Sequence, residues 1–346
     1  MRKITSLIII SSLLSFCGCS VSGQPMQVDE ENASVRDVFA MDTYMYLKAY
    51  GDSAEKALDI AVKRILTLDR TFSVKNTNSD TWSINHAEGK AVKVSEDTIN
   101  LLKTAQEIGS KTNGALDVTS YPLLKAWGFT MDTQQIPDSK TLRAASELVD
   151  FRKISLDNDS VCIPNGMQVD FGSLAKGYTS DQVVGILRES GVKSALVNLG
   201  GNVHAVGTKH DGTLWKVGVQ DPFFPSEQIC VLEISDLAVI TSGNYERCFT
   251  GEDGKEYWHI IDPKDGYPAD NGLVSVTIVG ESGLFCDALS TALFVLGTEK
   301  AIEYWHSEEN FEMILVTDDA KLYYTEGLKA SIDVSDKYNA EVVFYD

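Results

Sequence analysis

From residue 194 onward, short segments rich in valine and isoleucine, separated by glycine, proline and aspartate, dominate the chain. Such segments are typical of β-strands joined by turns. The strands expected in this half are Ser194–Val206, Leu214–Gln220, Ile229–Ile240, Glu256–Ile261 and Leu273–Val279, with two more around Met313–Val316 and Leu322–Tyr324. The second half of the chain is therefore expected to form β-sheets.

Helical patterns dominate the first half. After a strand over Val38–Tyr50, Ser53 is a candidate N-cap for one helix and Ser95 for a second. Two later helices are expected: one begins in the segment Asp170–Tyr178 and continues over Thr179–Ser190, and the other runs over Leu284–Leu296. Because the first half is rich in helices and the second half in strands, the pattern favours an α+β fold over a regular βαβ winding.

The chain is strongly acidic. Its 346 residues include 30 Lys and Arg against 50 Asp and Glu, which gives a net charge of −20. Such a surface repels nucleic acid and anionic lipid, so no nucleic-acid partner is expected. An anionic ligand would need a local device, such as a helix N-terminus, a metal ion or a few placed cations.

The N-terminus has the features of an export signal. Met1–Lys3 is basic, and Ile4–Phe16 is mostly apolar. The apolar stretch is too short to span a bilayer as a mature helix, but it has the length of a signal-peptide core. Its end resembles a bacterial lipoprotein cleavage site, where a cysteine after a small residue becomes lipidated.

Cys19 follows Gly18 and fits the lipidated position better than Cys17, which follows the bulky Phe16. The protein is then expected in the bacterial cell envelope, anchored to a membrane outside the cytoplasm on the periplasmic face. An ordinary secretory signal with incidental cysteines is the alternative. The expected divisions are a signal peptide over 1–18, a tether over 19–35 and a single domain over 36–346.

The remaining cysteines show no metal or dithiol pattern, since none stands in a C-x-x-C pair. We expect buried thiols, although an exported location also permits a disulfide that the sequence cannot pair. These cysteines are Cys162, Cys230, Cys248 and Cys286.

The segment DFGSLAKGY, Asp170–Tyr178, has the pattern of a strand end, a turn of small residues and the first turn of a helix. It is not a Walker loop, because Lys176 precedes its glycine and no hydroxyl follows. The amides after Ser173 open a helix N-terminus that favours an anion, and Lys176 adds a positive charge. Asp170 is an acceptor for a sugar hydroxyl or a flavin N–H. A tight turn with a solvated lysine is the alternative.

The late segment CDALSTALFVLG carries Asp287 and Thr291, four residues apart on one face of a helical turn. A carboxylate and a hydroxyl at this spacing form half of a site for a hard cation such as Mg²⁺, which completes its shell with water and phosphate oxygens. The alternative is an ordinary aspartate at a helix start.

HIIDPKDGYP places His259 on a strand that leads into an Asp-Pro turn. Histidine titrates near neutrality and often serves as a general base. A single histidine on a strand is also common as a structural residue.

Taken together, these segments resemble the ApbE-type FAD:protein FMN transferases. The resemblance covers about Met41 to Leu296 in the family's order, and a lipoprotein signal is common in that family. The matching segments are MDT (41–43), LDRTFS, SDTWSIN, TNGALDVTSYPLLKAWGF, DFGSLAKGY, VNLGGNV, LWKVGVQDP, TSGNYER, HIIDPKDGYP, LVSVTIVG and CDALSTALFVLG.

The resemblance implies mixed, largely antiparallel sheets with packed helices and FAD in a central cleft. It implies an enzyme that, with Mg²⁺, moves FMN from FAD to a Thr or Ser hydroxyl of an acceptor flavoprotein and releases AMP. The implied acceptor is a subunit of a membrane redox complex of the sodium-pumping NADH:quinone reductase or Rnf type.

By the same resemblance, Mg²⁺ ligands are the backbone oxygen of Ser173 and the side chains of Asp287 and Thr291, and His259 is the candidate base. Where some members carry another Asp, this chain has Ser290. Phe72 replaces a Tyr of some members, which keeps the ring and loses the hydroxyl. The FAD contacts carried over are Met41, Phe72, Ala115, Leu116, Asp117, Asp170, Lys176 and Ile261.

Two other functions remain open from the sequence. With water as nucleophile, the same site would be an FAD pyrophosphatase that yields FMN and AMP. A flavin-binding lipoprotein without chemistry is the other alternative, although binding alone would not require the pair Asp287 and Thr291.

The anchor can be tested on Cys19. Lipid on this residue would hold the mature chain in the membrane fraction, because two or more acyl chains give stable anchoring. Cys19→Ala should therefore release the protein to the soluble fraction, as measured by immunoblotting of fractionated cells. Cys17→Ala is the control and should remain membrane-bound; membrane retention of Cys19→Ala would refute the lipoprotein assignment.

Overall fold

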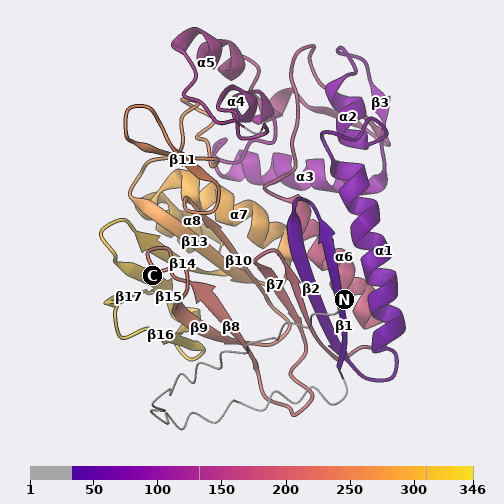
Figure 1. Ribbon diagram of the computed structural model, residues 1–346, viewed down its shortest axis with the longest axis vertical. Coiled ribbons are helices and arrows are strands. Elements are labelled where there is room, and N and C mark those ends of the chain that lie inside the picture. Colours follow the sequence, from indigo (N-terminus) through magenta and orange to yellow (C-terminus); the bar gives the residue numbers. More distant parts are fainter. Residues whose placement is uncertain (1–32, 132, 309, 346) are drawn as a thin grey trace, which may run out of the picture. The chain divides into compact units, whose positions relative to one another are not determined.

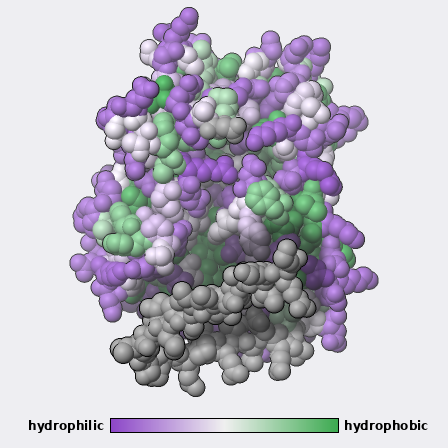
Figure 2. Space-filling model, in the orientation of Figure 1, coloured by the Kyte–Doolittle hydropathy of each residue, from purple (hydrophilic) through white to green (hydrophobic). Residues whose placement is uncertain are grey.

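The computed structural model describes residues 33–131, 133–308 and 310–345. The expected signal peptide 1–18, Cys19 and most of the expected tether lie outside these residues. Residues Ala33–Asp346 form one compact unit of the chain. No helix among the described residues is both long enough and apolar enough to cross a membrane. The face in Figure 2 is largely hydrophilic, with hydrophobic side chains scattered across it.

A nine-stranded sheet forms the centre of this unit (Figure 1). Its neighbouring strands pair antiparallel except for the last two, so the expected mixed, largely antiparallel arrangement is confirmed. In spatial order, the strands are β1 (Ala33–Ala40), β2 (Thr43–Tyr50), β6 (Ser194–Leu199), β7 (Asn202–Val206), β10 (Ala238–Gly243), β13 (Leu273–Gly280), β14 (Glu312–Thr317), β15 (Leu322–Thr325) and β17 (Ala340–Val343).

Three smaller sheets accompany it. They are β8 (Trp215–Gln220) with β9 (Gln228–Ile234) and β16 (Ile332–Val334); β3 (Val92–Lys93) with β4 (Ser155–Asp157) and β5 (Ser160–Cys162); and β11 (Cys248–Thr250) with β12 (Glu256–Trp258).

Both faces of the central sheet are covered in its middle. On β10, Ile240 packs into the core shared with α7, while its neighbour Val239 packs into the core shared with β8 and β9. All residues of β13 are buried, as a strand covered on both faces requires. The helices are α1 (Ala54–Phe72), α2 (Asp80–Asn85), α3 (Glu96–Lys111), α4 (Tyr121–Ala126), α5 (Ser139–Ser146), α6 (Ala175–Glu189), α7 (Gly283–Leu296) and α8 (Thr298–Glu308).

Three strands expected as continuous are each two strands. The stretch 38–50 turns at Met41 and Asp42, whose φ values of 51° and 57° lie in the left-handed region that a two-residue hairpin needs. The stretch 194–206 turns at Gly200 and Gly201. The stretch 229–240 breaks at Asp236, with β9 and β10 in different sheets. The expected strands were wrong here because apolar residues within a few positions on both sides of each turn continue the pattern of a single strand.

The helix starts were predicted more closely than the strands. Ser95 caps α3, since its hydroxyl accepts a hydrogen bond from the amide of Thr98 at 3.3 Å. Ser53 precedes α1 as expected, but its side chain makes no capping hydrogen bond. Of the four cysteines in the described part, two are buried as expected, whereas Cys162 is half-buried and Cys248 is exposed; all four are free thiols.

Helices α6 and α7 approach each other backbone to backbone at Gly177 and Gly283. A Cβ on Gly177 would lie 2.2 Å from the carbonyl oxygen of Gly283, and one on Gly283 would lie 2.1 Å from Oγ of Ser180. Asp181 of α6 accepts hydrogen bonds from the amides of Gly283 at 2.6 Å and Leu284 at 3.0 Å, and so caps α7. The crossing tolerates no side chain at either glycine.

Gly177→Ala should therefore destabilise the fold by about 1–3 kcal/mol, because the helices must separate to accept the methyl group. Gly185→Ala in the same helix is the matched control, since a Cβ there meets nothing within 4 Å. It should be neutral or stabilise by up to about 1 kcal/mol through helix propensity. Urea denaturation measures both variants. Equal effects at the two positions would contradict the close crossing.

Candidate functional site

A cavity of about 590 Å³ opens where the β1–β2 turn, the start of α6, the end of β10 and the first half of α7 meet. The structure brings every sequence-predicted site residue to its wall. These are Met41, Phe72, Ala115, Leu116, Asp117, Asp170, Ser173, Lys176, His259, Ile261, Asp287 and Thr291. Residues more than 240 positions apart in the chain thus share one site.

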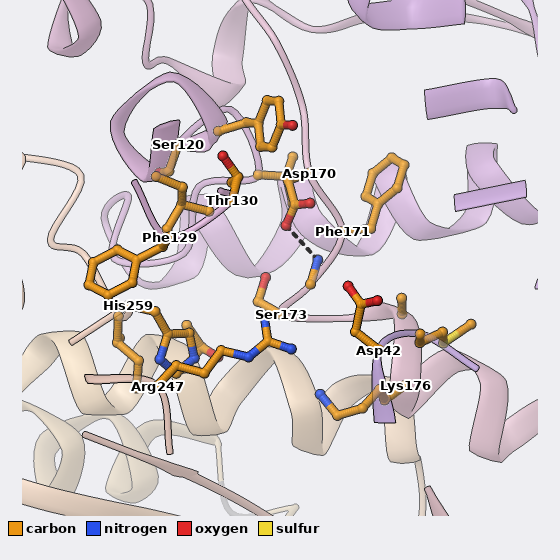
Figure 3. A pocket seen from close by; sticks show the side chains of 18 of the residues that line it. Asp42, Ser120, Phe129, Thr130, Asp170, Phe171, Ser173, Lys176, Arg247 and His259 are labelled. Carbon is orange, nitrogen blue, oxygen red and sulfur yellow. Dashed lines mark hydrogen bonds between the residues drawn. The ribbon is translucent and has the colours of Figure 1, made fainter. Parts of the chain in front are cut away.

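The DFGSLAKGY segment forms one wall. Asp170 Oδ1 accepts a hydrogen bond from the amide of Gly172 at 2.8 Å, which closes the turn ahead of α6. Burial raises the pKa of Asp170, against the opposing effects of that amide and of the charges on Arg247 and Lys176. Figure 3 shows Lys176 directed into the cavity near Asp42. Its side chain has no hydrogen bond or ion pair within the described part of the chain.

Asp287 and Thr291 project from α7 at the floor of the cavity. Asp287 is only 4% exposed, and its Oδ2 accepts a hydrogen bond from the amide of Gly177 at 2.8 Å. Thr291 Oγ1 lies 3.3 Å from Oγ of Ser242. Ser290 is fully buried, and its hydroxyl lies 2.8 Å from that of Ser242. Ser290 therefore contributes to packing between α7 and β10 and does not line the cavity.

The side-chain oxygens of Asp287 and Thr291 suit a hard cation, because carboxylate and hydroxyl oxygens are among the ligands that Mg²⁺ prefers. Within the described ranges, no group of three or more His, Cys, Asp or Glu side chains is close enough to hold a metal alone. The donor set of Asp287, Thr291 and the Ser173 carbonyl therefore fits Mg²⁺ only if water or a ligand supplies further oxygens.

His259 follows β12 and faces the cavity from the opposite wall (Figure 3). Its amide donates to the carbonyl oxygen of Arg247 at 3.1 Å, and its Nδ1 is buried without a hydrogen-bond partner among the described residues. Burial first, then the charges of Arg247 and Lys176, lower the pKa of His259 to about 4. The ring is therefore uncharged at neutral pH and has a lone pair available for a proton.

The carboxylate of Asp117 is occupied within the protein. Its Oδ1 accepts from the amide and hydroxyl of Thr119 at 2.8 and 2.6 Å, and its Oδ2 accepts from the amide of Phe151 at 3.0 Å. Phe72 is held edge-to-face by Phe171 and Tyr178, with ring centroids 5.8 and 5.9 Å away. Both residues thus shape the cavity wall through contacts inside the fold.

The sequence analysis did not single out several other lining residues. Arg247 stands in TSGNYER, which the sequence analysis names only among the segments that resemble the family. The signal that could have identified Arg247 is a basic residue within a polar segment of a strongly acidic chain, which is also the signal that identified Lys176. The other unpredicted lining residues include Tyr121, Phe129, Thr130, Ser242 and Glu246.

Two cations, an uncharged histidine and a floor of oxygen donors thus share one cavity. The cations suit an anionic ligand, the oxygen donors suit a hard cation that bridges to it, and the histidine suits a proton acceptor. This combination is appropriate for chemistry at a phosphate group.

Comparison with known proteins gives a consistent result. The model of the ApbE family matches residues 41–315. An FAD:protein FMN transferase of Klebsiella pneumoniae is 35% identical over 283 residues, which cover 80% of this chain and 87% of the relative. One of Treponema pallidum is 30% identical over 342 residues, covering 92% of this chain and 93% of the relative.

Solved structures agree in fold. The ApbE protein of Thermotoga maritima superposes with a TM-score of 0.81 at 30% identity, covering 86% of this chain and 98% of its own. The apo flavinyl transferase ApbE of Pseudomonas stutzeri gives a TM-score of 0.75 at 29% identity, covering 84% and 92%. On the family match, the similarity to these relatives and the shared fold, this chain belongs to the ApbE family.

Proposed function

We propose that this protein is an Mg²⁺-dependent FAD:protein FMN transferase that moves FMN from FAD to a Thr or Ser hydroxyl of an acceptor protein. Its relatives carry that name. The observation that carries the proposal is the convergence of Lys176, His259 and the pair Asp287 and Thr291 on one cavity. Mere storage of FAD would need no proton acceptor beside the phosphates.

The chain's own residues have separate tasks in this proposal. Lys176 binds the pyrophosphate of FAD, and the wall from Ala115 to Asp117 together with Phe72 and Ile261 surrounds the rest of the ligand. Asp287, Thr291 and the Ser173 carbonyl would hold Mg²⁺, which when bound neutralises charge on the phosphate oxygens. His259 accepts the proton of the attacking hydroxyl.

The test is incubation with FAD, Mg²⁺ and an acceptor domain, followed by gel fluorescence for bound flavin and by detection of AMP. A fluorescent acceptor band with equimolar AMP supports the transferase. AMP with free FMN and an unlabelled acceptor would instead identify a pyrophosphatase, and neither product would identify a binding protein.

We further propose that the acceptor is a subunit of a membrane redox complex of the sodium-pumping NADH:quinone reductase or Rnf type, and that Cys19 anchors the enzyme outside the cytoplasm. The support is the N-terminal sequence, which reads as a lipoprotein signal. An anchored enzyme would meet membrane acceptors on the same side of the bilayer.

Asp287→Asn tests the cation site by removing the negative charge while keeping an oxygen that can accept from the Gly177 amide. The rate of transfer should fall by about 100-fold or more, as when one electrostatic contact to a reacting group is lost. FAD binding, followed by flavin fluorescence, should change far less. Wild-type transfer by this variant at limiting Mg²⁺ would show that the metal site lies elsewhere.

Lys176→Met removes the positive charge of the side chain at the start of α6 but keeps its length, so it tests whether the charge itself binds FAD. A lysine there opposes the helix dipole, so its loss should leave stability unharmed. FAD affinity should fall by about 1–3 kcal/mol, the range for a charge-assisted hydrogen bond. Riboflavin, which has no phosphate, should bind the variant as it binds the parent in titrations followed by fluorescence. Equal losses for both ligands would mean that Lys176 only shapes the cavity.

A further inference from the structure

We propose that Arg247 is a catalytic residue of this site, whose guanidinium binds the phosphoryl group that is transferred. The inference rests on the proposed FMN transfer and adds a residue and a role to it. The two cations of the cavity then have different roles: Lys176 binds FAD, and Arg247 stabilises the reacting phosphate.

The first argument is that the Arg247 side chain makes no hydrogen bond or ion pair with another described residue, although its charge lowers the pKa of the nearby carboxyls of Asp170 and Glu246 against the effect of burial. Within the described part of the chain, every other arginine side chain makes an ion pair or a hydrogen bond, whereas Arg247 makes neither. The partnered arginines are Arg36 with Asp59, Arg64 with Asp97, Arg70 with Thr67, Arg143 with Glu147, Arg152 with Asp150 and Arg188 with Asp236. In a chain of net charge −20, a guanidinium that lines a cavity without a hydrogen-bonded carboxylate indicates an anionic ligand.

The second argument is position. Arg247 directly precedes β11, and its carbonyl oxygen accepts the amide hydrogen of His259 at 3.1 Å. Figure 3 shows its side chain crossing the cavity from the His259 wall, with the guanidinium reaching toward Ser173. Arg247 thus spans the space between the proposed base and the segment that carries Lys176.

The third argument locates the reacting phosphorus. The hydroxyl that gives its proton to His259 must lie within hydrogen-bond reach of that ring, and the phosphorus it attacks lies about 3–3.5 Å from its oxygen. The charge of Arg247 lowers the pKa of His259 more than the charge of Lys176 does, as expected if Arg247 is the nearer of the two cations. Arg247 is therefore the cation beside the attacked phosphate.

The step balances without a further reactant. The acceptor oxygen forms a bond to the FMN phosphorus, and the bond from that phosphorus to the bridging oxygen breaks. The bridging oxygen keeps the electron pair and leaves with AMP, while the hydroxyl proton passes to His259. The planar guanidinium can bind two phosphate oxygens at once, which a lysine cannot do.

The test compares Arg247→Met, Arg247→Lys and the control Arg143→Met with the wild-type protein, using FAD, Mg²⁺ and the acceptor domain. Arg143 is exposed on α5 and pairs with Glu147 at 3.5 Å, outside the cavity wall. Arg247→Met should slow single-turnover transfer at saturating FAD by about 1,000-fold, the lower range for an arginine that stabilises phosphoryl transfer. Its dissociation constant for FAD should rise less than about 10-fold, the equivalent of one lost contact.

Arg247→Lys should recover part of the rate, and added guanidinium ion should partly rescue Arg247→Met. The thermal midpoint and the control should match the wild type. Unchanged transfer at saturating FAD in Arg247→Met would overturn the proposal, as would a rate loss with no rescue by lysine or guanidinium. Failure of the proposed function is distinct, because the wild-type protein itself would then leave the acceptor unlabelled.

Discussion

The contact of Gly177 with Gly283 positions the chemistry of the whole site. Gly177 follows Lys176 directly, and Asp287 lies one helical turn after Gly283, so the crossing of α6 and α7 brings the helix start that carries Lys176 to the first turns of the helix that carries Asp287. The hydrogen bond from the Gly177 amide to Asp287 is a product of the same approach. A wider crossing would move the start of α6 away from the first turns of α7, and with it Lys176 away from the helix that carries Asp287.

The acidic composition of the chain means that an anionic ligand can be attracted only by cations placed in the cavity itself. A chain with a net charge of −20 presents an unfavourable field to an anionic ligand, so attraction must be local. In the proposed function Lys176 and Arg247 supply it, and the same charges help burial to keep His259 neutral. One electrostatic arrangement thus suits an anionic ligand and leaves His259, the proposed base, unprotonated.

The sequence predicted the helices and the site better than it predicted the strands. Ser95 and the DFGSLAKGY motif carry local signals for helix starts. Most of the expected site residues came from the resemblance to a family, and all of them line the cavity. The β1–β2 hairpin was missed because its turn contains no glycine. Arg247 was missed because its lack of an internal partner is a property of the folded structure and not of neighbouring residues.

The turn at Met41 and Asp42 has a broader consequence. Two non-glycine residues with positive φ are an unfavourable choice for a hairpin, whose preferred residues are Asn and Gly. The amide of Met41 is fixed to Asp69 at 2.8 Å, and both turn residues line the cavity. A consensus Asn-Gly turn would make the hairpin more robust and would remove two side chains from the wall. A substitution that stabilises this turn would therefore be expected to weaken contacts between the cavity wall and a ligand.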